Sequence, residues 1–272
     1  MMELEIRLFA TLKDRAGSER IRVSLPTGPL TAADVLAAVA ADYPALAPAL
    51  RSALVAVNRA FAGPETPVRA GDEVALFPPV SGGEETLCPP ISEEEEALSL
   101  TLPQGGREPE PPRPPGEGSW PTYFAVTPDP LDLDAIHAHL GGPEIGALVS
   151  FTGFVRGRTQ RDGLPPETLQ LDYEAYEDMA TAKMAQIARE IWARWPMVRG
   201  VALVQRLGRL AVGDVTTFVA CAGRHRDEGV FEAARYGIDR LKEIVPVWKK
   251  EIGADRSVWV EGHYRPTPDD NL

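Results

Sequence analysis

Phe-Pro-Pro-Val-Ser-Gly-Gly, residues 77–83, closes the first compact segment of a chain of 272 residues. The two glycines carry no Cβ, so a tail that ends in them can pass through a narrow channel and present an unhindered carboxylate. Within a chain, the same pair more commonly forms a flexible turn. The sequence on either side decides between these two interpretations.

The next segment, residues 84–119, has the composition of a linker. It holds two Lys/Arg against nine Asp/Glu, together with eight prolines and the acidic run Glu93–Glu96. It therefore carries more than half of the net charge of −12. Such a composition cannot bury enough apolar surface to fold, so we expect a disordered segment. An extended linker of this length need not hold its flanking domains in contact.

Residues 1–83 have the pattern of a small α+β domain. Alternating apolar residues predict strands at 4–8 and 21–25, joined by a turn near residues 15–18 into a hairpin. Thr31 is a candidate N-cap, with Asp34 three residues later, for a helix that Pro44 interrupts. Two further short strands are expected at 54–58 and 73–77. The order strand, strand, helix, strand, strand is typical of a β-grasp, ubiquitin-like domain.

Several strings in this domain resemble the small sulfur-carrier subunit of molybdopterin synthase. They are residues 7–10 (RLFA), 57–58 (VN), 71–75 (GDEVA) and 77–83 (FPPVSGG). The resemblance covers residues 1–83 and implies that Gly83 is adenylated and converted to a thiocarboxylate.

A peptide bond joins Gly83 to Glu84, so Gly83 has no free carboxylate in the intact chain. We therefore hypothesise that a processing protease cuts the exposed linker after Gly83. The sequence contains no Gly-x-x-x-x-Gly-Lys phosphate loop, so a separate ATP-dependent adenylating and sulfurating enzyme is expected to act on Gly83.

Residues 120–272 have the pattern of a second, larger domain. Strands are expected at 146–153, 169–176, 201–206 and 215–222, the first of them buried, and a helix at 179–195. A second helix is predicted by apolar residues at spacings of three and four, namely Phe231, Ala234, Ile238, Leu241 and Val245. Arginines 156, 158 and 161 lie in a polar loop after the first strand, and Arg224-His225-Arg226 follows the last one. Each of these basic groups is a candidate anion site or a solvated turn.

Lys242 lies off the centre of the second helix's apolar stripe and close to its end at Pro246. A surface lysine at a helix C-terminus is normally charged and extends into solvent. To act as a base or nucleophile it must lose its proton. Partial burial and neighbouring cations, for which Arg226, Lys249 and Lys250 are candidates, would favour that loss.

Further strings resemble the large, catalytic subunit of molybdopterin synthase, over roughly residues 120–264. They are residues 150–153, 155–156, 172–176, 223–226, 238–242, 246–251 and 259–261. The resemblance implies an α/β hammerhead-type domain, with Lys242 and Lys249 as catalytic residues. It implies substrate-anion contacts at Arg156, His225 and Arg226. Gly262-His263 stands where the family often has an arginine, and Lys250 and His263 are additional candidates.

Together the two resemblances imply an enzyme of molybdenum cofactor biosynthesis, a sulfurtransferase that needs no cofactor of its own. Sulfur would pass from the Gly83 thiocarboxylate to cyclic pyranopterin monophosphate and form the dithiolene of molybdopterin. A dithiolene has two sulfurs and each carrier brings one, so two carriers must visit each site, which favours a mobile carrier. The family also implies a homodimer through residues 120–272.

Other classes of protein have less support. No apolar run reaches the length of a membrane span and the start lacks the pattern of a signal peptide, so a cytoplasmic protein without membrane contact is expected. Cys88 and Cys221 support neither a disulfide framework nor a metal site. The tryptophans do not alternate with basic runs, which argues against a nucleic-acid platform.

Two alternative interpretations of the whole chain stay open. The chain could be a non-enzymatic ubiquitin-like carrier or protein tag fused to a binding domain. It could also be an inert storage precursor until it is cut.

Overall fold

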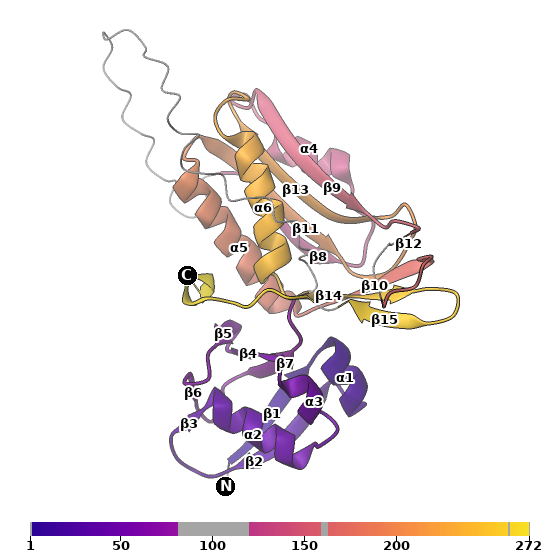
Figure 1. The fold of residues 1–272 in the computed structure, drawn as a ribbon. Helices are drawn as coiled ribbons and strands as arrows, with labels where there is room; N and C mark the ends of the chain where they lie inside the picture. Colours follow the sequence, from indigo (N-terminus) through magenta and orange to yellow (C-terminus); the bar gives the residue numbers. More distant parts are fainter. Residues whose placement is uncertain (1, 81–119, 159–162, 261, 272) are drawn as a thin grey trace, which may run out of the picture.

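A computed structural model describes residues 2–80, 120–158, 163–260 and 262–271. They form an N-terminal domain, residues 2–80, and a C-terminal domain that begins at Trp120, and the two lie against each other (Figure 1). The expected linker, Gly83, Cys88, Arg161 and Glu261 lie outside the described residues. Among the described residues, no helix is both long and apolar enough to cross a bilayer.

The N-terminal domain is a five-stranded sheet covered on one face by helix α2, as a β-grasp domain requires. The sheet order is β2-β1-β7-β4-β5, with β1 and β7 parallel and the other neighbours antiparallel. Its elements are β1 (Met2–Leu8), α1 (Ala10–Ala16), β2 (Arg20–Leu25), β3 (Leu30–Thr31), α2 (Ala32–Asp42), α3 (Ala47–Leu50), β4 (Leu54–Val57), β5 (Ala60–Ala62), β6 (Pro67–Val68) and β7 (Val74–Phe77).

The expected strands and helix of this domain are confirmed. The Thr31 hydroxyl accepts from the Asp34 amide and the Asp34 carboxylate accepts from the Thr31 amide, which is a complete capping box. The expected simple hairpin is wrong in one respect, because helix α1 lies between β1 and β2. The predicted turn at 15–18 is the end of this helix, where Gly17 adopts φ 67°.

The two faces of strand β7 bury different partners. Side chains alternate along a strand, so Val74 and Leu76 enter the domain's own core, beside α2. Ala75 and Phe77 point the other way and pack into a core shared with the C-terminal domain. All four are buried. The sheet of the N-terminal domain is therefore buried on both faces only because the second domain covers one of them.

The C-terminal domain contains two four-stranded sheets, β8-β11-β13-β9 and β12-β10-β14-β15. Helices α5 and α6 lie side by side on one face of the first sheet, and α4 covers the other (Figure 1). The elements are β8 (Thr122–Thr127), α4 (Leu133–Leu140), β9 (Ala147–Phe154), β10 (Gln170–Ala175), α5 (Glu177–Arg194), β11 (Val198–Arg206), β12 (Gly208–Ala211), β13 (Val215–Gly223), α6 (Val230–Ile244), β14 (Val247–Ile252), β15 (Ser257–Val260) and the 3-10 turn η2 (Pro268–Asn271).

Two expectations for this domain are corrected. The strand predicted at 146–153 exists as β9, but it is an edge strand whose side chains are partly or fully exposed, because no strand of the described residues lies along its outer edge. Phe231 does not belong to the buried stripe of α6 and is 57% exposed, whereas Ala234 and Leu241 are buried as expected. Phe231 lies in the first turn of α6, and the stripe there begins at Val230.

Candidate active site

The contact between the two domains has an aromatic centre that fixes the end of the N-terminal domain. Phe9 stacks on Trp248 of β14 with ring centroids 5.2 Å apart, and Phe77 lies at the same distance from the Trp248 ring. The indole Nε1 of Trp248 donates a hydrogen bond of 2.9 Å to the Pro78 carbonyl. The segment that leads towards Gly82-Gly83 is therefore held at a fixed point on the C-terminal domain.

Polar contacts surround this aromatic centre. The Tyr176 hydroxyl donates to Glu73 at 2.6 Å, Lys250 pairs with Asp14 at 2.9 Å, and the Trp259 indole donates to the same Asp14 carboxylate. Although burial alone would raise it, the hydrogen bonds from Trp259 and Lys250 hold the pKa of Asp14 below its usual value. Lys250, an additional candidate from the sequence, thus lies in the contact between the domains.

Just beyond Pro79 the chain enters a small pocket in the C-terminal domain. Val80 is 2% exposed and lines this pocket, whose volume is about 50 Å³. The other lining residues come from β10, β11, the end of α6 and β14: Tyr173, Gln205, Leu241, Lys242, Val245, Val247 and Lys249. The two lysines expected to be catalytic therefore meet at the place where the described part of the N-terminal domain ends. Gly83, three residues after Val80, lies outside the described residues.

The environment of Lys242 favours loss of its proton. Burial, and then the positive charge of Lys249, lower the pKa of Lys242 to about 7. Its Nζ donates a hydrogen bond of 3.2 Å to the Thr217 hydroxyl. Thr217 in turn donates to Gln205 at 2.8 Å, so the chain of hydrogen bonds holds the amine in position. Of the neighbours suggested by the sequence, Lys249 acts on this pKa; Lys250 faces Asp14 instead.

The side chains of Lys249 and Lys250 point to opposite faces of β14 because the two residues are consecutive in the strand. Successive side chains of a strand point to opposite faces, so only one of the two can face the pocket. Lys249 lies opposite Tyr173 of β10 in the ladder, and both line the pocket. Burial raises the pKa of Tyr173 to about 12, which keeps its hydroxyl protonated at neutral pH.

The three expected anion-binding residues do not lie together in the folded subunit. Gly153 of β9 pairs with Thr217, the partner of Lys242, so Arg156 leaves the sheet at the same end as Lys242. His225 and Arg226 follow the other end of β13, where they line an open hollow of about 500 Å³ with Gly146 and Ala147. Thr217 is six positions before Gly223, the last residue of β13, which corresponds to roughly 20 Å along the strand before His225 is reached.

His263 and Cys221 do not line the lysine pocket. His263 is exposed and is not among the residues lining the pocket. Cys221 is buried in β13, and burial raises the pKa of its thiol to about 12, so it is not a reactive thiolate. Within the described ranges, no group of three or more His, Cys, Asp or Glu side chains is placed to hold a metal ion.

Residue-by-residue reasoning missed three residues that position Lys242 or the incoming segment. Gln205, Thr217 and Trp248 were not singled out, yet Gln205 and Thr217 hold Lys242 and Trp248 holds the incoming segment. The sequence does contain a signal for Gln205 and Thr217. Gln205 and Thr217 are polar residues within otherwise apolar strands, and a fully buried polar side chain needs a dedicated partner.

Comparisons with known proteins agree with this division of the chain. The model of the ThiS family matches residues 6–83, and that of the MoaE protein matches residues 126–244. A molybdopterin synthase catalytic subunit of Halalkalibacterium halodurans is 43% identical over 137 residues, which are 50% of this chain and 84% of that protein. Another, from a Nostoc species, is 45% identical over 138 residues and is covered to 81%.

A solved structure of molybdopterin synthase from Staphylococcus aureus is 38% identical, with a TM-score of 0.47, and the match covers 52% of this chain and 97% of that one. Half of the chain matches more than four fifths of the two catalytic subunits named above, and the domain before it matches the ThiS family. The chain belongs to the molybdopterin synthase catalytic subunit family, with a ThiS-family domain fused in front of the catalytic domain.

Proposed function

We propose that this chain is a molybdopterin synthase that contains its own sulfur carrier. The N-terminal domain, from here the carrier domain, delivers sulfur as a thiocarboxylate on Gly83. The C-terminal domain, from here the catalytic domain, accepts cyclic pyranopterin monophosphate and forms the dithiolene. The observation that supports this most strongly is the burial of Val80 in the pocket of Lys242 and Lys249. Three residues can span up to about 10 Å, enough to bring Gly83 to both amines.

The pocket supplies suitable groups for sulfur transfer. With a pKa near 7, about half of Lys242 is neutral at neutral pH and can accept a proton or attack a carbonyl. We assign proton transfer to Lys242. Lys249, which lowers that pKa, stabilises the negative charge that develops during transfer.

We propose that the substrate phosphate is held by two copies of the chain. Arg156 lies at the Lys242 end of the sheet, whereas His225 and Arg226 lie at the opposite end. A contact from His225 and Arg226 to a small molecule in the lysine pocket therefore has to come from a second subunit. This arrangement fits a homodimer formed through residues 120–272, in which each subunit supplies part of the other's site.

We further propose that sulfur transfer requires a cut after Gly83. In the intact chain the Gly83 carbonyl belongs to a peptide bond, so there is no carboxylate to adenylate. A protease that acts within 84–119 and a separate ATP-dependent sulfurating enzyme complete the system. Since activation consumes ATP, we place these steps in the cytoplasm.

The test is a sulfur-transfer assay with purified proteins. Protein cut after Gly83, thiocarboxylated and mixed with cyclic pyranopterin monophosphate should yield the dithiolene product. The intact chain should yield none, and the cut protein with Lys242→Ala should lose about a hundredfold or more in rate. A carrier or tag without enzymatic activity would give no product from the cut protein. An intact chain that accepts sulfur and turns over would refute the requirement for a cut.

A further inference from the structure

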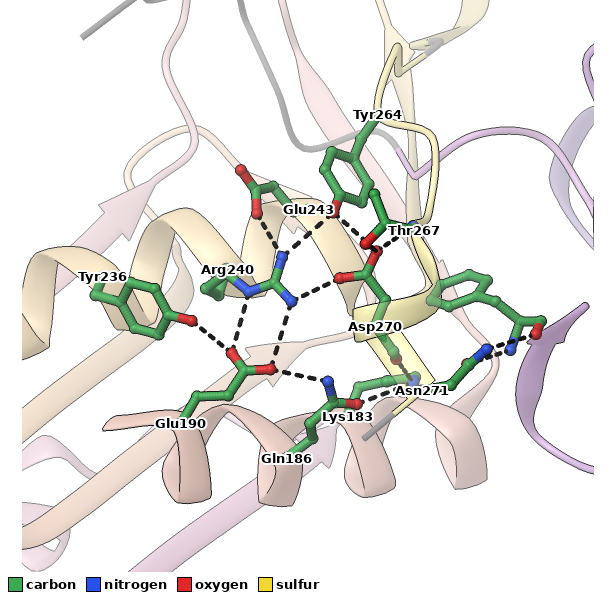
Figure 2. Close-up of polar contacts among 11 residues, drawn as sticks. Lys183, Gln186, Glu190, Tyr236, Arg240, Glu243, Tyr264, Thr267, Asp270 and Asn271 are labelled. Carbon is green, nitrogen blue, oxygen red and sulfur yellow. Dashed lines mark hydrogen bonds and ion pairs between the residues drawn. The ribbon is translucent and has the colours of Figure 1, made fainter. Parts of the chain in front are cut away.

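Residues 264–271, from here the strap, lie between the two domains and contact both (Figure 2). One end of the contact is Asp270, whose side chain is 1% exposed. Its carboxylate accepts hydrogen bonds from Arg240 at 2.6 Å and from the Tyr264 hydroxyl at 2.9 Å. The amide and hydroxyl of Thr267 donate to the same carboxylate. The strap is therefore folded around a single buried acid.

Helices α5 and α6 supply the anchor for that acid. Arg240 of α6 also pairs with Glu190 of α5 at 3.1 Å and with Glu243 at 2.7 Å. The Tyr236 hydroxyl donates to Glu190 at 2.6 Å, and the Lys183 amine donates to the backbone carbonyl of Asp270 (Figure 2). A connected network of buried polar groups fixes geometry better than one exposed ion pair does. The strap thus has a fixed position on the catalytic domain.

The other end of the contact is the carrier domain's edge strand. The Asn271 side chain accepts from the Phe61 amide at 2.9 Å and donates to the Phe61 carbonyl at 2.8 Å. β5, which contains Phe61, is the last strand in the sheet order. An amide that bonds both backbone groups of one residue reproduces a rung of a β-ladder. Asn271 therefore recognises an unpaired strand edge rather than a particular side chain.

The Phe61 ring is recognised separately. The Lys183 Nζ lies 5.1 Å from the centroid of that ring, within the range of a cation–π contact. Lys183 thus joins the strap, through the Asp270 carbonyl, to the aromatic side chain of the carrier. Backbone and ring of one carrier residue are held from two directions, by Asn271 and by Lys183.

We propose that the strap is a docking device: it holds the carrier domain on the catalytic domain by the edge strand β5, with Asn271 as the positioning residue. This proposal rests on the proposed function, because a carrier that brings one sulfur has to stay docked during transfer and then give way to a second. The hold consists of two partly buried hydrogen bonds and one ring contact, and none of them involves Lys242 or Lys249. It sets how long a carrier stays without changing the chemistry.

If Asn271 made only a local contact, its loss would affect Phe61 alone. If it docks the whole carrier domain, its loss would also affect contacts between the domains that lie far from Phe61. Two such contacts are available. The Ala10 backbone amide donates a hydrogen bond of 3.2 Å to the Glu174 carboxylate of the catalytic domain, and the Trp248 indole donates one of 2.9 Å to the Pro78 carbonyl. Ala10 follows β1, which is separated from β5 by β7 and β4. Three strand spacings place it roughly 14 Å from Phe61 across the sheet. Both groups become exposed to solvent only when the whole carrier domain moves away.

The experiment is amide and indole hydrogen exchange, followed by NMR, on the full uncut chain with Asn271→Ala. Asn271 is exposed, so its truncation leaves the core intact. We expect exchange at Phe61, Ala10 and the Trp248 indole to accelerate together by about tenfold, since two hydrogen bonds are lost. The matched control is Ser257→Ala, an exposed residue of β15, which should keep wild-type exchange at all three groups.

Faster exchange at Phe61 alone, or at none of the three groups, would overturn the proposal. The measurement involves no sulfur chemistry. Failure of the docking device is therefore distinguishable from failure of the proposed function, which the sulfur-transfer assay tests.

Discussion

Lys242 illustrates how the fold changes the chemistry of one residue. A lysine in the last turn of a helix normally keeps its proton, because the helix C-terminus favours positive charge. Here burial and the neighbouring Lys249 outweigh that effect and lower the pKa of Lys242 to about 7. The sequence suggested both causes, but only the antiparallel pairing of β10 with β14 shows that Lys249 faces the pocket and Lys250 does not.

Lys249→Gln should raise the pKa of Lys242. Removing a nearby positive charge makes protonation easier, so the titration moves to higher pH and the neutral fraction at pH 7 falls by about threefold. Burial, the larger cause, remains and keeps the pKa below that of a free lysine. The measurement is an NMR titration of the Lys242 side chain, which does not require an active enzyme. An unchanged or lowered pKa in the variant would show that the two amines are not coupled.

At the scale of the element, strand β14 contributes both to the lysine pocket and to the contact with the carrier domain. Val247 and Lys249 line the pocket, Trp248 holds the incoming segment and Lys250 pairs with the carrier domain's Asp14. The alternation of a single strand therefore places the lysine pocket on one face and the contacts with the carrier domain on the other.

Trp248→Phe should weaken the delivery of the carrier's end to the pocket. The ring can still stack on Phe9, but the hydrogen bond to the Pro78 carbonyl is lost, which should cost about 1 kcal/mol. We expect sulfur transfer in the cut protein to fall by about fivefold, which the dithiolene assay measures.

Trp192→Phe is the matched control for this variant. The Trp192 indole N–H has no hydrogen-bond partner among the described residues, so its removal should leave the transfer rate unchanged. An equal loss in both variants would show that the effect comes from altered packing and not from the bond to Pro78.

The elements that the sequence predicted well are those with strong local signals. Helix α2 has its capping box at Thr31, and α6 has regular apolar spacing. Helix α1 was missed because its seven residues carry no side-chain cap and few apolar positions. Phe231 was misplaced because apolar spacing alone does not distinguish it from its neighbour Val230, which is the buried residue of that turn.

The candidate active site was only partly predictable for a related reason. Lys242, Lys249 and Arg156 lie at one end of the sheet, as the resemblance implies for one site. His225 and Arg226 lie at the other end, because they follow β13 where it leaves the sheet. Sequence strings carry no information on which copy of the chain a residue serves. The sequence also does not show which domain an apolar residue packs against. Phe9 and Phe77 belong to the carrier domain but are buried against the catalytic domain.

At the scale of the whole molecule, complementation tests the shared site. A 1:1 mixture of Lys242→Ala chains with His225→Ala/Arg226→Ala chains, allowed to exchange subunits, should regain about a quarter of wild-type sulfur transfer. Half of the dimers are then mixed, and each mixed dimer has one complete site if the anion-binding residues act across the dimer. Should they act within their own subunit, every site would keep a defect and no activity would return.

The two domains lie in contact, which the linker's composition did not predict. An aromatic centre, a polar rim and the strap hold the carrier domain over the pocket in which Val80 is buried. The need for two sulfur deliveries still favours a carrier that can leave. Gly83 can carry sulfur on a carboxylate only if it becomes a chain end, which is the central claim of the account.

Intact-mass analysis of the protein recovered from its own cells tests that claim most directly. We predict a fragment that ends at Gly83, part of it with one carboxylate oxygen replaced by sulfur, together with a separate catalytic fragment. Recovery of the full-length chain alone, from cells whose molybdopterin synthase is active, would contradict it.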